Sequence, residues 1–164
     1  MTLKNIGMQY VIDYRDELDF RIALVITLVK NFSENRNGKK LLSVEKLRLL
    51  ILICLTPKKL NKVSISLNKK SINNLQNIFY NDSLSNLDAS ELREISLLIA
   101  YMCKAEYLQI AHESSKFIII GQEAANFAES ISDSAPLYLS RNFKLIKLIS
   151  GKSESQITKA LLEI

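Results

Sequence analysis

Residues 88–131 read DASELREISLLIAYMCKAEYLQIAHESSKFIIIGQEAANFAESI, and this stretch decides the expected fold. Asp88, followed three residues later by Glu91, resembles a helix-starting capping box, and apolar residues then recur at helical spacing. We therefore expect a helix that ends near Lys104. Its predicted inner face consists of Leu92, Ile95, Leu98, Ile99 and Met102. An aspartate at Leu98 should then unfold the protein, because it would place an unpaired charge in the core.

A hairpin is expected after this helix. Residues 107–110 and 117–120 are two β-prone runs, and the polar residues 112–116 between them suit a surface turn. Gly121 can adopt backbone angles closed to other residues, so we expect a hinge there into a helix at 122–131. The apolar stripe of that helix is Ala124, Phe127, Ala128 and Ile131. This order of elements predicts the second half of a winged helix, and a generic helix and hairpin is the alternative.

The composition indicates one compact domain of mainly α class. The chain has 164 residues, 48% of them hydrophobic, which suffices for a real core. We divide it into a basic helical part (1–87), a winged-helix-like unit of helix, β-hairpin and helix (88–131), and a C-terminal helical pair (132–164).

The basic helical part is expected to begin with a helix capped by Asp13 or Asp16 that runs to about Asn31. The inner stripe of this helix is predicted to be Leu18, Ile22, Val25, Ile26 and Val29. Residues 33–40 are polar and read as a loop.

Ser43 is the expected cap of the next helix, which Pro57 ends. Its run 47–55 is nearly all apolar, which indicates burial on several sides. Two shorter helices or turns are predicted over 58–80, and the alternation in VSISLN (63–68) leaves a strand open. The inward-facing residues of this segment are expected to be Leu60, Val63, Ile65, Leu67, Ile72, Leu75, Ile78 and Phe79.

The C-terminal pair begins near Pro136, and its first helix is expected to stop at Gly151. That helix contains Leu139, Phe143, Ile146, Leu148 and Ile149. Ser153 and Gln156 form a capping box for the last helix. The apolar stripe of the last helix is Ile157, Ala160, Leu161 and Ile164. The pair could fold back on its own domain or dock on a partner, and we favour folding back.

Charge is unevenly distributed along the chain. Residues 1–70 carry a net charge of +8, residues 71–133 carry −6, and residues 134–164 carry +3. The helix before the hairpin holds Asp88, Glu91 and Glu94 against Arg93 and Lys104. Its exposed side would therefore meet a phosphate backbone with like charge, so we do not expect it to bind duplex DNA.

Lysines and arginines gather in the loop at 33–40 and around the turn after Pro57. One interpretation is a positive surface that lies near DNA held by a larger assembly, and its residues would be Arg36, Lys39, Lys40, Lys58, Lys59, Lys62, Lys69 and Lys70. The other is an ordinary solvated surface, which we favour because few aromatic residues are interleaved to stack on bases.

Catalytic patterns are absent from the sequence. His112 is the only histidine, no Walker A, G-x-G-x-x-G or H-E-x-x-H pattern occurs, and Cys54 and Cys103 form no C-x-x-C pair. We expect no enzyme, no cofactor and no metal, and two free thiols in a reducing compartment. No signal peptide and no apolar run of about 18 residues is found, so a cytoplasmic protein without a membrane segment is expected.

The order of segments also resembles a known family, the middle components of three-component ABC-type systems, which include the small subunit of Lamassu antiphage systems. The resemblance is carried by DFRIALVITLVKNF (19–32), ENRNGKKLLS (34–43), VEKLRLLILICL (44–55), TPKKLNKV (56–63), LREISLLIAYMCKAEYLQI (92–110), FIIIGQEAANFAESI (117–131) and SRNFKLIKLISGKSESQITKALLEI (140–164). It implies a partner ATPase of the SMC type and an effector, often a nuclease, and it carries over no catalytic residue. The chain departs from a typical wing at Ile120-Gly121-Gln122, where the usual threonine before the glycine is missing.

Charge and resemblance together predict a non-catalytic accessory subunit that bridges an SMC-like ATPase and an effector in a prokaryotic defence complex against phages or plasmids. Such a subunit would be part of a hetero-oligomer and would meet DNA only indirectly or weakly. Its expected protein interface consists of Glu91, Glu94, His112, Glu113, Ser114 and Ser115. Reversing Glu91 and Glu94 to lysine should weaken assembly without unfolding the chain. The alternatives are a stand-alone winged-helix DNA-binding transcription regulator and, far behind, a small enzyme.

Overall fold

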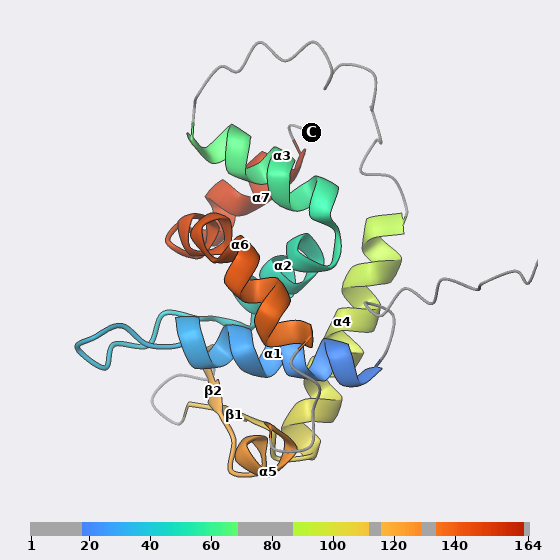
Figure 1. The fold of residues 1–164 in the computed structure, drawn as a ribbon, viewed down its shortest axis with the longest axis vertical. Helices are drawn as coiled ribbons and strands as arrows, with labels where there is room; N and C mark the ends of the chain where they lie inside the picture. The colour runs from blue at the N-terminus through green and yellow to red at the C-terminus, as the bar shows by residue number, and fades with distance from the viewer. Residues whose placement is uncertain (1–17, 69–86, 112–115, 129–133, 163–164) are drawn as a thin grey trace, which may run out of the picture.

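The computed structural model describes residues 18–68, 87–111, 116–128 and 134–162 (Figure 1). The elements in these ranges are α1 (Leu18–Phe32), α2 (Val44–Leu55), α3 (Pro57–Asn68), α4 (Leu87–Lys104), β1 (Leu108–Ile110), β2 (Ile118–Ile120), α5 (Ala124–Ala128), α6 (Ser134–Ser150) and α7 (Glu154–Leu162). The protein is mainly helical with one small antiparallel hairpin. The expected class, a helical domain with a helix, hairpin and helix unit, is confirmed.

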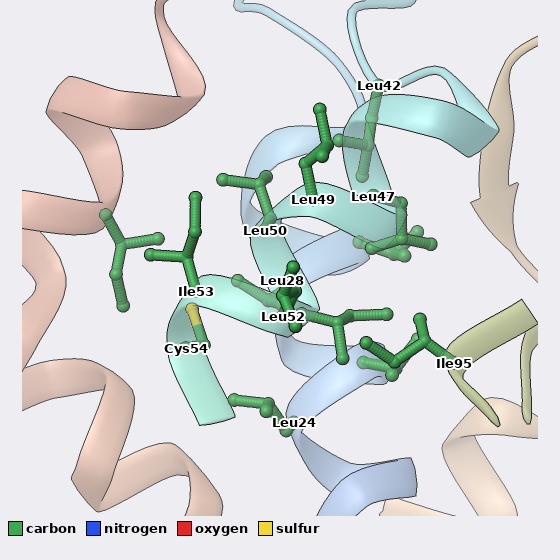
Figure 2. Packing of buried hydrophobic residues seen from close by; sticks show 14 of the residues in the cluster. Leu24, Leu28, Leu42, Leu47, Leu49, Leu50, Leu52, Ile53, Cys54 and Ile95 are labelled. Atoms are coloured by element: carbon green, nitrogen blue, oxygen red, sulfur yellow. The ribbon is translucent and has the colours of Figure 1, made fainter. Parts of the chain in front are cut away.

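Helix α2 lies at the centre of the fold. Ser43 is its N-cap, and the Ser43 Oγ accepts a hydrogen bond from the Lys46 backbone N–H at 3.1 Å, as the sequence predicts. The helix packs against α1, α3, α4, α6 and α7, and every residue from Leu49 to Cys54 is buried. Figure 2 shows buried side chains on several sides of α2, with Ile95 of α4 beside them. The expected burial on several sides is confirmed.

Helix α1 is buried more widely than its predicted stripe. Four of the five predicted inner residues are buried, but Leu18 is 56% exposed, so its assignment to the inner stripe is wrong. Leu24 and Leu28 are buried as well, because α6 packs along α1 and β2 also contacts it. The expected caps Asp13 and Asp16 lie outside the described residues.

The segment after α2 is one continuous helix as far as it is described. Thr56 ends α2 in an extended conformation, and Pro57 begins α3, where a missing N–H costs no helical hydrogen bond. Residues 63–68 are helical, so the strand alternative is wrong. Leu60 and Val63 are buried against the core, whereas Ile65 and Leu67 are only half-buried.

The remaining residues predicted for this segment lie beyond the end of α3. They are Ile72, Leu75, Ile78 and Phe79, which fall within residues 69–86, outside the described part of the chain.

The hairpin pairs Leu108 with Ile120 and Ile110 with Ile118, close to the predicted runs. A third short segment joins it from the start of α2, since Ser43 forms an antiparallel bridge with Phe117 and the Ile118 N–H donates to the Leu42 carbonyl at 2.9 Å. β2 therefore lies between β1 and the residues that lead into α2. The arrangement is winged-helix-like, because the hairpin closes onto the chain that precedes an earlier helix.

Gly121 is required for a different reason from the one the sequence suggests. The chain turns here from β2 towards α5, as expected, but the φ of Gly121 is not positive. A Cβ at this position would lie 2.1 Å from the backbone oxygen of Glu106, the residue with φ 62° at the end of the α4 turn. Glycine is needed because two backbone segments approach closely here.

Helix α5 follows this contact and is held by an aromatic pair. Tyr107 and Phe127 have ring centroids 5.1 Å apart, and Ala124 is buried. Ala124 and Phe127 belong to the predicted apolar stripe, and Phe127 is half-buried. The side chains of Ala128 and Ile131 lie outside the described residues.

The C-terminal pair folds back onto the domain, as favoured from the sequence. Helix α6 packs on α1, α2 and α3, and the Tyr138 hydroxyl donates a 2.6 Å hydrogen bond to the Cys54 carbonyl at the end of α2. The Ser153 N–H donates to Gln156 Oε1 and the Gln156 N–H donates to Ser153 Oγ, which confirms the capping box. Helix α7 then buries Ile157, Ala160 and Leu161 against α2 and α3.

Candidate functional site

Helix α4 carries two apolar faces. Ile95, Ile99 and Met102 face the core and are 2%, 5% and 0% exposed. On the opposite side Leu97 is 64% exposed and Tyr101 is 50% exposed. These two residues are four positions apart and therefore lie one turn from each other on the same face. We call this exposed side, with Ala100 beside it, the outer stripe of α4.

The predicted inner face of α4 is only partly confirmed. Leu92 and Leu98 are half-buried at its margins rather than in its centre. Leu98 lines a surface groove, so a charge at this position would remain partly solvated. We therefore expect an aspartate at buried Ile99, rather than at Leu98, to unfold the protein.

A groove of about 240 Å³ runs between α4 and the start of α1. It is lined by Leu18, Arg21, Glu94, Leu98 and Tyr101. Exposed Leu18 thus extends the outer stripe sideways onto α1. Singly exposed apolar side chains are common on proteins, but Leu18 and Tyr101 line one groove from two helices, with exposed Leu97 one turn from Tyr101, and such a grouping is typical of a protein contact surface.

Glu91 and Glu94, two of the acidic residues predicted for the interface, are paired with cations of the same chain. Glu94 Oε2 lies 3.7 Å from Arg21 Nη1, and the Glu94 side chain remains 62% exposed. Glu91 Oε2 lies 3.2 Å from Lys59 Nζ on α3. A basic partner surface would have to compete with these cations. The charge of α4 that is open to a partner is therefore smaller than the sequence count suggests.

Only part of the predicted interface lies within the described residues. His112, Glu113, Ser114 and Ser115 lie outside the described residues, but the Lys116 carbonyl next to them accepts from the Val44 N–H at the start of α2. Glu91 instead contacts α3, which follows the end of α2.

The basic residues are likewise divided between the two ends of α2. In the loop before it, Arg36 and Lys39 are exposed and Lys40 pairs with Glu34. After it, Lys58 is exposed, Lys59 pairs with Glu91 and Lys62 is half-buried, while Lys69 and Lys70 lie outside the described residues.

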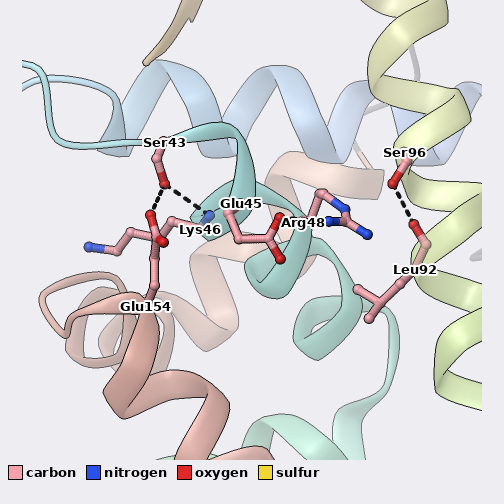
Figure 3. Close-up of polar contacts among 7 residues, drawn as sticks. All are labelled: Ser43, Glu45, Lys46, Arg48, Leu92, Ser96 and Glu154. Atoms are coloured by element: carbon pink, nitrogen blue, oxygen red, sulfur yellow. Dashed lines mark hydrogen bonds and ion pairs between the residues drawn. The ribbon is translucent and has the colours of Figure 1, made fainter. Parts of the chain in front are cut away.

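A polar cluster at the start of α2 serves packing. Ser43 Oγ accepts from the Lys46 N–H and donates to Glu154 Oε1 in the first turn of α7 (Figure 3). Burial lowers the pKa of the Lys46 ammonium, and the nearby Glu154 carboxylate opposes this shift. The cluster joins α7 to the α2 N-terminus, where a carboxylate is favoured by the helix dipole.

The two cysteines differ in accessibility. Cys54 of α2 is buried, and desolvation raises the pKa of its thiol to about 12. Cys103 of α4 is half-buried, and desolvation raises the pKa of its thiol as well. Among the described residues, no three histidine, cysteine, aspartate or glutamate side chains come together in a way that could hold a metal ion. No helix in the described ranges combines the length and apolarity needed to cross a bilayer.

Sequence reasoning missed Leu18, Leu97 and Tyr101. A signal was present for α4, because Leu97, Ala100 and Tyr101 recur at helical spacing on the side opposite to Ile95 and its neighbours. A helix that is apolar on two sides needs two partners. No comparable signal existed for Leu18, whose exposure depends on where α1 meets α4.

Comparison with known proteins gave no match to a family model, a curated protein or a solved structure.

Proposed function

We propose that this chain is a non-catalytic accessory subunit that binds other proteins, bridging an SMC-like ATPase and an effector. The observation that carries the proposal is the outer stripe of α4. Leu97 and Tyr101, with Leu18 beside the groove, offer a large apolar surface on the helix that precedes the hairpin. Covering exposed apolar surface of this kind with another protein lowers the free energy, because it removes that surface from water.

The charges on the same face support protein over nucleic acid as the partner. Among the described side chains, the exposed charged residues of α4 near the stripe are Arg93, Glu94 and Lys104, a net charge of +1 that is too small to neutralise several phosphates. DNA-binding helices need cations to neutralise phosphates, and the carboxylate of Glu94 would repel a phosphate backbone.

The partner classes in this proposal rest on the resemblance of segment order to middle components of ABC-type systems. A bridging subunit needs two separate contact faces. The outer stripe and its groove would supply one, and the region around the hairpin and the start of α2 would supply the other.

The test is co-purification with the proteins encoded beside it. The wild-type chain, Leu97→Asp and Leu162→Asp are each co-expressed with those neighbours and captured by a tag on the ATPase. Leu162 is 70% exposed on α7 and provides a matched control. We expect capture of the wild type and the control and loss of Leu97→Asp. A wild-type chain that elutes alone contradicts the proposal.

A stand-alone DNA-binding regulator is the second candidate, favoured only by the exposed Arg36, Lys39 and Lys58. Filter binding to duplex DNA at two salt concentrations separates the two. A regulator binds selected sequences by itself, whereas the accessory subunit should bind weakly, without sequence selectivity, and lose that binding as salt rises.

A further inference from the structure

We infer that the exposed side of α6 binds the phosphate backbone of duplex DNA through Arg141, Lys144 and Lys147, which we call the basic row of α6. The inference deepens the proposed function, because it names the surface that makes the weak, non-selective DNA contact expected of the accessory subunit. It does not depend on which protein covers the outer stripe of α4.

The basic row of α6 follows the length of the helix. Its three residues are three positions apart, so they are neighbours on the helix surface, and all of them are exposed. From Arg141 to Lys147 the helix rises about 9 Å. One strand of a DNA duplex carries about three phosphates over that length, so each cation of the row can meet a phosphate.

Carboxylates are scarce around the basic row. Residues 134–153 contain no aspartate and no glutamate. In the described parts of α1, α2 and α3, which pack against α6, the carboxylates are Asp19 at the start of α1 and Glu45 of α2. Glu45 is paired with Arg48 at 2.6 Å. A phosphate backbone on α6 would therefore meet little like charge.

The cations of the basic row are also not neutralised by the protein itself. The ion pairs found between described residues use Arg21, Lys40, Arg48 and Lys59. Throughout the described ranges, the side chains of the basic row have no anionic partner. An external anion can therefore bind them without breaking an ion pair, unlike an anion that approaches Lys59 or Arg21.

The surroundings of the basic row favour DNA over a membrane surface. A helix that lies in a bilayer surface inserts its apolar face among the lipids. The apolar face of α6, with Leu139, Ile146 and Ile149, is buried in the core. Phe143 is partly exposed but stacks on Phe32 of α1 at a centroid distance of 5.8 Å, so its ring is already packed against the protein. A membrane would thus be held by charge alone.

DNA is favoured over an acidic protein surface by the uniform sign of the row. Protein surfaces that bind each other carry charges of both signs in complementary patterns, whereas a phosphate backbone presents negative charge throughout. A row of cations with no carboxylate among them matches the second pattern. Contacts to phosphates carry no sequence information, so this surface fits an accessory subunit and not a regulator that selects its sites.

Fluorescence anisotropy of a labelled DNA duplex, titrated with the full-length chain between about 50 and 200 mM salt, tests the inference. The row variant carries Arg141→Gln, Lys144→Gln and Lys147→Gln. The control variant carries Arg36→Gln, Lys39→Gln and Lys104→Gln, which also removes one arginine and two lysines that are exposed. Both variants lose three positive charges, and circular dichroism confirms that both are folded.

The row variant should bind the duplex at least about tenfold more weakly than the wild type at the lowest salt concentration. The slope of log affinity against log salt should fall by about two to three, because each phosphate contact contributes about 0.9. The control variant should lose much less of both. Equal losses in the two variants would show that only the net charge of the chain matters, and would overturn the inference.

Two other polyanions test the class of ligand. The same titrations are made with polyglutamate and with vesicles of phosphatidylserine and phosphatidylcholine. The duplex should be bound more tightly than either at equal salt. Tighter binding of polyglutamate or of the vesicles overturns DNA as the ligand of the basic row.

The outcomes separate this inference from the proposed function. A row variant that is still captured by the neighbouring proteins but has lost duplex binding supports both. A wild-type chain that binds the duplex through the basic row but captures no neighbour supports the inference and contradicts the proposed function. A wild-type chain that is captured but shows no duplex binding at about 50 mM salt overturns the inference alone.

Discussion

Helices α2 and α4 both carry apolar residues on more than one side, but the protein covers these sides completely only in α2. Residues from Leu49 to Cys54 are buried around α2 by five neighbouring helices. In α4 the inner face is buried, whereas Leu97 and Tyr101 remain 64% and 50% exposed. The difference shows that apolar residues on two sides of a helix need not both be covered by the same chain, and we propose that another protein molecule covers the second side of α4.

The largest loss of stability is expected from a substitution on the inner face of α4. Ile99→Asp should unfold the protein, because it places an unpaired charge at a position that is 5% exposed. Leu97→Asp, two residues earlier on the outer stripe, should change the free energy of unfolding by no more than about 0.5 kcal/mol. Urea unfolding followed by circular dichroism measures both. Similar losses of stability would mean that the outer stripe is part of the core.

The next effect concerns the turn that fixes the end of α4. Gly121→Ala should cost about 3 kcal/mol, because its Cβ would lie 2.1 Å from the backbone oxygen of Glu106. Gly151→Ala is the control, since its Cβ would meet its nearest neighbours at 3.6 Å, an ordinary contact, and its φ is not positive. Thermal melting of the two variants should differ clearly, and equal melting temperatures would refute the close approach.

The cysteines of α2 and α4 should affect the pH dependence of the free energy of unfolding differently. The pKa of the Cys54 thiol is raised to about 12 in the fold from 9.0, so the native state keeps a proton that the unfolded state loses. Its contribution to stability is present below pH 9 and is lost by about 1.4 kcal/mol per pH unit as pH rises from 9 to 12. Urea unfolding across this range should show a shallower decline in Cys54→Ala than in Cys103→Ala. Parallel declines would contradict the burial of Cys54.

The rate at which a thiol-labelling reagent reacts at neutral pH compares the accessibility of the two cysteines in the native protein. Half-buried Cys103 should react slowly in the native protein, and buried Cys54 should react only after denaturation. Mass spectrometry of the labelled peptides measures both rates, and rapid labelling of native Cys54 would be the contrary result.

The smallest expected effect is at the ion pair between α4 and α3. Glu91→Gln should cost no more than about 1 kcal/mol, because the Glu91 side chain is 46% exposed and solvent screens the pair. A double-mutant cycle with Lys59→Met isolates the pairwise part of this energy. A coupling of several kcal/mol would show that the acidic side of α4 is held much more firmly than its exposure implies.

Local signals in the sequence predicted much of the fold. The Ser43 cap, the capping box at Ser153 and Gln156, and the hairpin runs depend on residues within a few positions of one another, and the structure has all of them. Gly121 was identified as a special position, but from backbone angles rather than from the approach of Glu106, which sequence spacing does not reveal.

Features that depend on tertiary placement could not be predicted. The bridge between Ser43 and Phe117 and the pairing of Glu91 with Lys59 join segments that only the folded chain brings together. Charge counting therefore placed a free acidic face on α4, whereas Glu91 and Glu94 already have cationic partners. The exposed apolar side of the same helix had a visible period, but periodicity alone does not tell which of two apolar faces the core will cover.

The central claim is that a protein covers the outer stripe of α4, and hydroxyl-radical footprinting of Tyr101 tests it most directly. The purified chain at low concentration is compared with the complex captured from co-expression, with Phe143 of α6, which is 38% exposed, as the internal control. We predict that oxidation of Tyr101 falls several-fold in the complex while that of Phe143 is unchanged. Equal oxidation of Tyr101 in both samples would contradict the account.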